Sequence, residues 1–126
     1  MSQQMAQPAH HEWQEALDAI TARHGGQPVT VQVLSAEQGS QLLADHDALA
    51  HIIYRESDDV LVVCFNSAQD DVRREHIIKR PFSIIFDGPA DALERIDIEG
   101  ADGARTLITL HHRHADATAR RSASSS

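Results

Sequence analysis

The stretch that most constrains the fold is 48–65, where two apolar segments rich in β-branched residues flank a short acidic break. A tight turn through Ser57 and Asp58 predicts a β-hairpin whose register places Ile52 opposite Val63. One face is then apolar and the other half apolar, so we expect the hairpin at the centre of a sheet with cover on both faces. The expected core face is Ala50, Ile52, Tyr54, Leu61, Val63 and Phe65, and the opposite face is His51, Ile53, Arg55, Val60, Val62 and Cys64.

An amphipathic helix is predicted ahead of the sheet. Apolar residues recur there at helical spacing on a single stripe, and the glycine pair at 25–26 ends the helix. A helix of about four turns is marginal alone in water, so we expect its stripe to pack on the sheet with Trp13 as the anchor. The stripe consists of Trp13, Leu17, Ile20 and His24.

The rest of the chain up to residue 110 predicts further short strands. Residues 29–34 alternate with a period of two, which indicates a half-buried strand. Residues 35–47 are expected to form a short helical turn and then a loop, with Leu42 and Leu43 facing inward. Later strands are expected at 72–80, 82–86, 93–99 and 106–110, with a polar turn at 66–71, a break at Pro81 and a hairpin turn at Asp102 and Gly103. The register of the last hairpin stays open.

Short connections favour antiparallel neighbours over parallel strands with crossover helices. The expected class is α+β: an N-terminal amphipathic helix packed on a strongly curved antiparallel meander sheet, or on a small β-barrel, of about seven strands. The chain has 126 residues, which suits one domain. We place that domain at 10–112 and expect 1–9 and 113–126 to be disordered, because polar segments without periodicity bury too little apolar area to order themselves.

Composition narrows the classes of partner. A net charge of -8 argues against a general binder of nucleic acid or anionic membranes, since phosphate contacts need a basic surface. The single cysteine, Cys64, cannot form an internal disulfide and suits a reducing compartment. No secretory signal and no apolar run of membrane-spanning length is visible, so we expect a cytoplasmic protein.

Three segments together resemble a known family. They are Tyr-Arg-Glu-Ser-Asp-Asp-Val-Leu at 54–61, His-Ile-Ile-Lys-Arg-Pro-Phe-Ser-Ile at 76–84, and the Asp-Gly turn near the end. The resemblance covers roughly 13–110 and is to a family of small bacterial proteins known only as a domain of unknown function. It implies a bacterial cytoplasmic setting and one compact domain, and it brings no catalytic residue, cofactor or substrate.

The one basic concentration in this acidic chain lies at 73–80 and is a candidate binding site. On a strand it would place Arg74, His76 and Arg80 on one face, where they could bind an anion or phosphate. The simpler interpretation is favoured: charges on an edge strand protect it from pairing with other chains.

Two further groups of titratable residues are candidate sites. The histidines at 10–11 and at 111–114 lack the spacing of known ligand sets, so no metal site is predicted. Asp45, His46, Asp47 and His51 could carry acid–base chemistry, yet such residues are equally typical of turns. No phosphate loop, nucleophile elbow or zinc motif is present, so no catalytic residue and no cofactor are predicted, and an enzyme is the less favoured class.

Two hypotheses about function follow. The first is a non-enzymatic binding or self-associating module, a homodimer in its simplest form, because an apolar second sheet face needs a cover that one short helix cannot supply. The second is a small-molecule or anion binder, conceivably an enzyme, that uses the sheet interior with the basic strand at its rim. A dimer with an apolar interface would favour the first, and a deep pocket with converging polar groups would favour the second.

Overall fold

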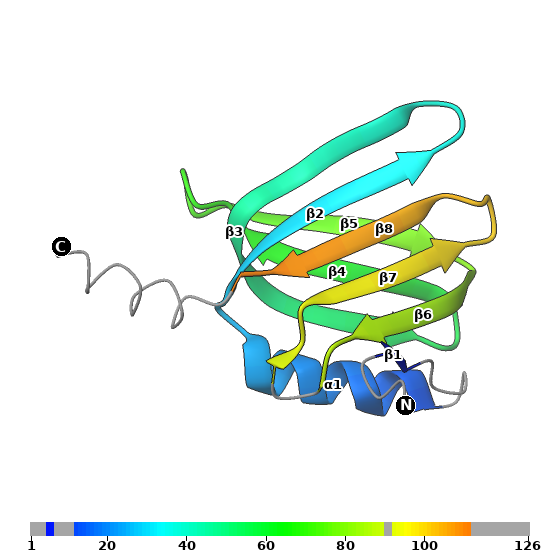
Figure 1. The fold of residues 1–126 in the computed structure, drawn as a ribbon, viewed down its shortest axis with the longest axis horizontal. Helices are drawn as coiled ribbons and strands as arrows, with labels where there is room; N and C mark the ends of the chain where they lie inside the picture. Colours follow the sequence, from blue (N-terminus) through cyan, green and yellow to red (C-terminus); the bar gives the residue numbers. More distant parts are fainter. Residues whose placement is uncertain (1–4, 7–11, 90–91, 112–126) are drawn as a thin grey trace, which may run out of the picture.

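One helix and eight strands form an α+β domain in a computed structural model that describes residues 5–6, 12–89 and 92–111 (Figure 1). No helix in this part of the chain is long and apolar enough to cross a lipid bilayer. The elements are β1 (Met5–Ala6), α1 (Trp13–His24), β2 (Pro28–Ser35), β3 (Gly39–Arg55), β4 (Val60–Asn66), β5 (Arg73–Lys79), β6 (Pro81–Asp87), β7 (Arg95–Gly100) and β8 (Arg105–Leu110). The tail at 113–126, expected to be disordered, lies outside the described residues.

All strands join one antiparallel sheet in the order β1-β6-β7-β8-β2-β3-β4-β5. Two meanders, β2 to β5 and β6 to β8, meet where β8 pairs with β2. The expected α+β class is confirmed, but the strands form an open sheet and not a closed barrel, with β1 and β5 at its ends. Figure 1 shows β3 bending strongly, so that β4 and β5 lie behind the front strands.

The central hairpin forms in the predicted register. Ile52 pairs with Val63 and Tyr54 with Leu61, and all four side chains are buried in the core. One position was wrong: Ala50 does not face the core, because the register shifts between Leu49 and His51 and turns Leu49 inward. A bulge adds one residue to a strand, which reverses the alternation of faces on its far side.

Tyr54 also fixes the turn of this hairpin. Its hydroxyl donates a hydrogen bond to Asp59 Oδ1 at 2.7 Å. Burial, and then this bond to a carboxylate, raise the pKa of Tyr54 from 10.0 to about 12. The folded state therefore disfavours the phenolate. The protonated Tyr54 hydroxyl contributes its full stabilisation of the fold below pH 10, and this contribution is lost as the pH rises through about 12.

We therefore expect the free energy of unfolding to fall between pH 10 and pH 12 more steeply in the wild-type protein than in Tyr54→Phe. Urea denaturation at several pH values across this window measures both slopes. The phenylalanine variant serves as the control because it retains every pH-dependent contribution except that of the Tyr54 hydroxyl. Equal slopes in the two proteins would contradict the raised pKa.

The segment 35–47 differs from its prediction. It continues as strand β3, which pairs with β2 from Ser35 opposite Gly39 down to Pro28 opposite Ala48. The Ser35 hydroxyl accepts a hydrogen bond from the Gln38 amide at 3.0 Å, which closes a tight turn and does not start a helix. The inward placement of Leu42 was wrong, since its side chain is 61% exposed, whereas Leu43 is half-buried against the core.

Helix α1 buries the predicted residues Trp13, Leu17, Ile20 and His24. The amide of Gly25 bonds to Thr21 O, and Gly26 then adopts a φ of +86°, so the glycine pair ends the helix as expected. The Trp13 ring meets Tyr54 edge-on, with centroids 5.1 Å apart. The helix thereby covers the core face beneath β3 (Figure 1).

The predicted break between β5 and β6 is present, but it falls at Arg80. This residue has a φ of 47° and separates the two strands, while Pro81 is buried as the first residue of β6. The last hairpin turns at 101–104, with Ile96 opposite Ile108 and Glu99 opposite Arg105. The bend at Arg80 moves the chain from the β4 side of the sheet to the β7 side.

Candidate functional site

A cleft of about 380 Å³ opens where the second half of β5 passes the β7–β8 turn. One wall is the β5 segment and corner at 76–80, and the other is formed by Ala101, Asp102 and Ala104 of the turn. Val33 of β2 and its pairing partner Thr106 of β8 complete the lining. Half of the lining residues are aliphatic, a composition that suits an apolar ligand with few polar groups.

Gly100 lets the turn approach β5 this closely. A Cβ at this position would lie 3.2 Å from Ile78 Cγ2 and 3.4 Å from the carbonyl oxygen of Lys79. The turn itself is held by Asp102, whose Oδ1 accepts a hydrogen bond from the Ala104 amide at 3.0 Å. The two walls of the cleft are therefore fixed relative to each other by short-range contacts.

A hydrogen-bonded pair crosses the interior of the cleft. His76 Nε2 of β5 lies 3.2 Å from Thr106 Oγ1 of β8, and the Thr106 side chain is buried. Burial lowers the pKa of His76, so its imidazole is neutral at pH 7. The pair therefore adds polarity to the cleft without adding charge.

The predicted anion site is split by the structure. His76 and Arg80 line the same cleft, with the Arg80 amide donating to Asp59 O at 2.8 Å. Arg74 lies outside this cleft and forms an exposed ion pair with Asp70 at 3.5 Å. Sequence reasoning missed Thr106 and Asp102, because only the curvature of the sheet brings β8 and its turn against β5.

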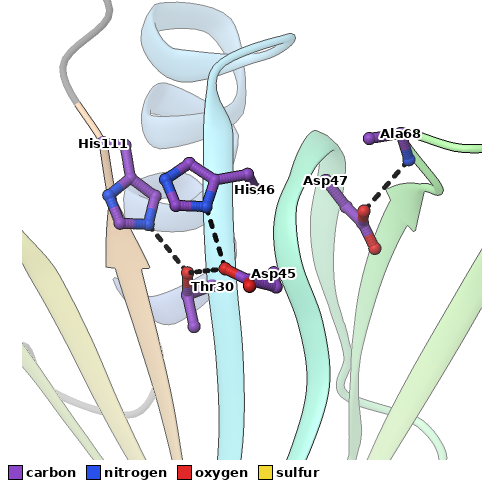
Figure 2. A network of polar contacts seen from close by, with 6 residues as sticks. All are labelled: Thr30, Asp45, His46, Asp47, Ala68 and His111. Carbon is purple, nitrogen blue, oxygen red and sulfur yellow. Dashed lines mark hydrogen bonds and ion pairs between the residues drawn. The ribbon is translucent and has the colours of Figure 1, made fainter. Parts of the chain in front are cut away.

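A second polar cluster lies beside a bulge between β2 and β3 (Figure 2). His46 is the extra residue and has a φ of 62°. Its Nδ1 lies 2.8 Å from Asp45 Oδ1, and its ring stacks on that of His111 with centroids 4.0 Å apart. Thr30 Oγ1 links His111 to Asp45: it lies 2.7 Å from His111 Nε2 and 3.4 Å from Asp45 Oδ1.

This cluster contains only part of the predicted acid–base group. Asp47 points away and accepts a hydrogen bond from the Ala68 amide at 3.0 Å (Figure 2). His51 lies past the next bulge, opposite Cys64. Thr30 was missed as a partner, whereas His111 had been noted only within the histidine group at 111–114.

Exposure to water limits the chemistry that the cluster around His46 and Asp45 can perform. The side chains of His46 and Asp45 are 61% and 63% exposed, so water screens their interaction. Acid–base catalysis favours a placed pair with tuned pKa values, which desolvation helps to produce. The contacts tie the end of β8 to β2 and β3 and are explained by that structural role.

Comparison with known proteins places the chain in a family. A family described as a family of unknown function (DUF5335) matches residues 4–118. The chain belongs to this family. The match confirms the resemblance expected from the segments at 54–61 and 76–84 and carries no activity with it. No curated protein and no solved structure matches the chain with significance.

Among the described residues, no group of three or more His, Cys, Asp or Glu side chains is arranged to hold a metal ion. His10, His11, His112 and His114 lie outside the described residues.

Cys64 has the setting of a structural residue. It is buried on the outer side of β4, with Sγ 3.8 Å from Glu75 Oε2. Burial, followed by the nearby Glu75 carboxylate, raises the pKa of the Cys64 thiol. The thiolate, the reactive form, is therefore disfavoured.

Proposed function

We propose that this protein is a non-enzymatic binding module that self-associates through the free edge of β5. The observation that carries the proposal is the outer edge of this strand. Within the described part of the chain β5 pairs only with β4, so its other edge offers unpaired backbone groups to a partner. Ile77, near the end of this edge, is 53% exposed.

The side chains of β5 suit an antiparallel copy of the same strand. If Ile77 pairs with Ile77 of a second copy, Glu75 lies opposite Lys79 of that copy, and the reverse pair forms by symmetry. Opposite residues share a face, so both ion pairs flank the isoleucine pair. The left-handed backbone of Arg80 ends the strand, which limits the pairing to 75–79.

An apolar row supports the same register. Ile53 of β3 pairs with Val62 of β4, which pairs with Ile77 of β5. Across the proposed joint this row would continue into the identical row of the second copy. The charges on β5, which alone would protect an edge, become self-complementary in this one register.

Charge exchange tests the proposal. We expect the wild-type protein to approach twice 13.9 kDa in sedimentation equilibrium. Glu75→Lys and Lys79→Glu each place like charges opposite each other and should weaken association roughly tenfold. The double variant E75K/K79E restores opposite charges and should restore the dimer.

Melting temperatures of the same variants serve as the control: values close to that of the wild-type protein would mean that the substitutions leave the monomer fold intact. A monomeric wild-type protein at about 1 mM, the concentration that detects even weak dimers, would refute the proposal. A double variant as weak as the single variants would refute the register.

We further propose the bacterial cytoplasm as the setting, supported by the buried free thiol of Cys64 and the family resemblance. A second candidate function is binding of a small ligand in the cleft beside Arg80, favoured by the lining described above. The cleft and the pairing segment share residues 76–79, whereas Arg80 and Thr106 line the cleft outside that segment.

A further inference from the structure

We infer that the cleft between β5 and the β7–β8 turn binds a small organic carboxylate with an apolar body. The inference deepens the second candidate function and does not depend on self-association. The volume of the cleft, about 380 Å³, lies within the range of small-molecule sites. Aliphatic residues of three elements, Val33, Ile78 and Ala104, line it and would contact the apolar body.

Arg80 supplies the positive charge. Arg80 lines the cleft and forms no ion pair with any side chain that the structure describes, and Lys79 of the same wall adds a second cation. A guanidinium binds a carboxylate through two parallel hydrogen bonds, and apolar surroundings strengthen them.

The backbone at Arg80 points to the same role. A φ of 47° is costly for any residue with a side chain, and glycine would adopt it freely. The Arg80 amide is nevertheless fixed to Asp59 O at 2.8 Å, so the corner is held rigidly at the rim of the cleft. Strained residues of this kind are enriched at ligand sites.

The remaining polar groups orient the ligand. The hydrogen-bonded pair of Thr106 and neutral His76 adds polarity without charge. Asp102 lines the turn side and repels an anion, while its carboxylate caps the turn through Ala104. The carboxylate of the ligand therefore lies at the Arg80 end, away from Asp102.

Octanoate is the probe, with octanamide as its uncharged match and acetate as a carboxylate without a tail. In ¹H–¹⁵N NMR titrations of the full chain at pH 7, octanoate is expected to shift the amides of Arg80, Ala104 and Thr106 saturably. Arg80→Gln should weaken binding at least about tenfold, the scale of one lost charged hydrogen-bonding partner. Asp102→Asn, which keeps the turn cap, should tighten it.

Two variants make the result specific. Arg74→Gln removes the same charge from β5, outside the cleft, and should change binding less than about twofold, within the small effect of a screened surface charge. Arg80→Gly should lose octanoate without a lower melting temperature, because glycine suits the backbone.

The inference is overturned if octanoate shows no saturable shift at about 10 mM, a concentration that detects even very weak ligands. It is equally overturned if octanamide or acetate binds as tightly as octanoate, or if R80Q and R74Q behave alike. None of these variants alters 75–79, so the dimer and the ligand site can fail separately.

Discussion

Replacing Ile52 with alanine is expected to lower the free energy of unfolding by about 2 to 5 kcal/mol, as for other large-to-small changes in cores. Its side chain is fully buried opposite Val63, in the middle of the β3–β4 strand pair. Urea denaturation followed by circular dichroism measures the loss. The core cluster that contains Ile52 draws its residues from several strands and the helix, and interiors packed to this density relax only partially around a cavity.

Two substitutions on the other face of β3 serve as controls. Arg55→Ala removes an exposed side chain and should change stability by no more than about 0.5 kcal/mol. Ile53→Ala, at a half-buried position, should cost less than Ile52→Ala. If I53A proved as severe as I52A and its midpoint rose with protein concentration, the outer face would be buried in a dimer.

The central hairpin could be predicted because independent signals agree there. The Ser57–Asp58 turn and the alternation of Ile52 and Tyr54 both select one register, and a slip by one residue would expose the whole core face. The stripe of α1 is equally unambiguous, since glycines stop the helix immediately after His24. Where local and long-range preferences coincide, the sequence alone is sufficient.

The bulged strand β3 could not be predicted in full. Each of its bulges shifts the alternation by one residue, so that Leu49 replaces Ala50 in the core and Leu42 turns outward. No single window contains this information, because a bulge is selected by the partner strand and its contacts. The turn at Ser35 uses the same residue types that begin a helix, and only the pairing of β2 with β3 distinguishes the two.

Only part of the candidate site could be predicted from the sequence, for a related reason. His76 and Arg80 are close in sequence, and the alternation of β5 predicts that they share a face. Thr106 reaches His76 only because β5 folds back over β8, which is four strands away in the order of the sheet. Contacts of this kind depend on curvature, and curvature follows from twist and bulges distributed over the whole sheet.

Replacing Trp13 with alanine should cost about 3 to 5 kcal/mol of unfolding free energy, the range found for large aromatic residues in cores. The ring is 2% exposed and meets Tyr54 edge-on, so the change removes both buried area and an aromatic contact. It also removes the first anchor of α1, a helix of 12 residues that has little stability of its own. Circular dichroism during urea denaturation measures the change, since the variant lacks the only tryptophan.

Hydrogen exchange on the same variant locates the damage. We expect amides of α1 to lose protection first, because the helix depends on packing, while β4 and β7 keep theirs. Gln14→Ala is the matched control: this neighbour is exposed, its amide donates a hydrogen bond to Asp18 Oδ1 at 2.9 Å, and its loss should cost about 0.5 kcal/mol or less. Should W13A be too unstable to purify, Trp13→Phe retains part of the contact and should show an intermediate loss. If W13A and W13F were both as stable as Q14A, the helix would be held by residues other than its predicted anchor.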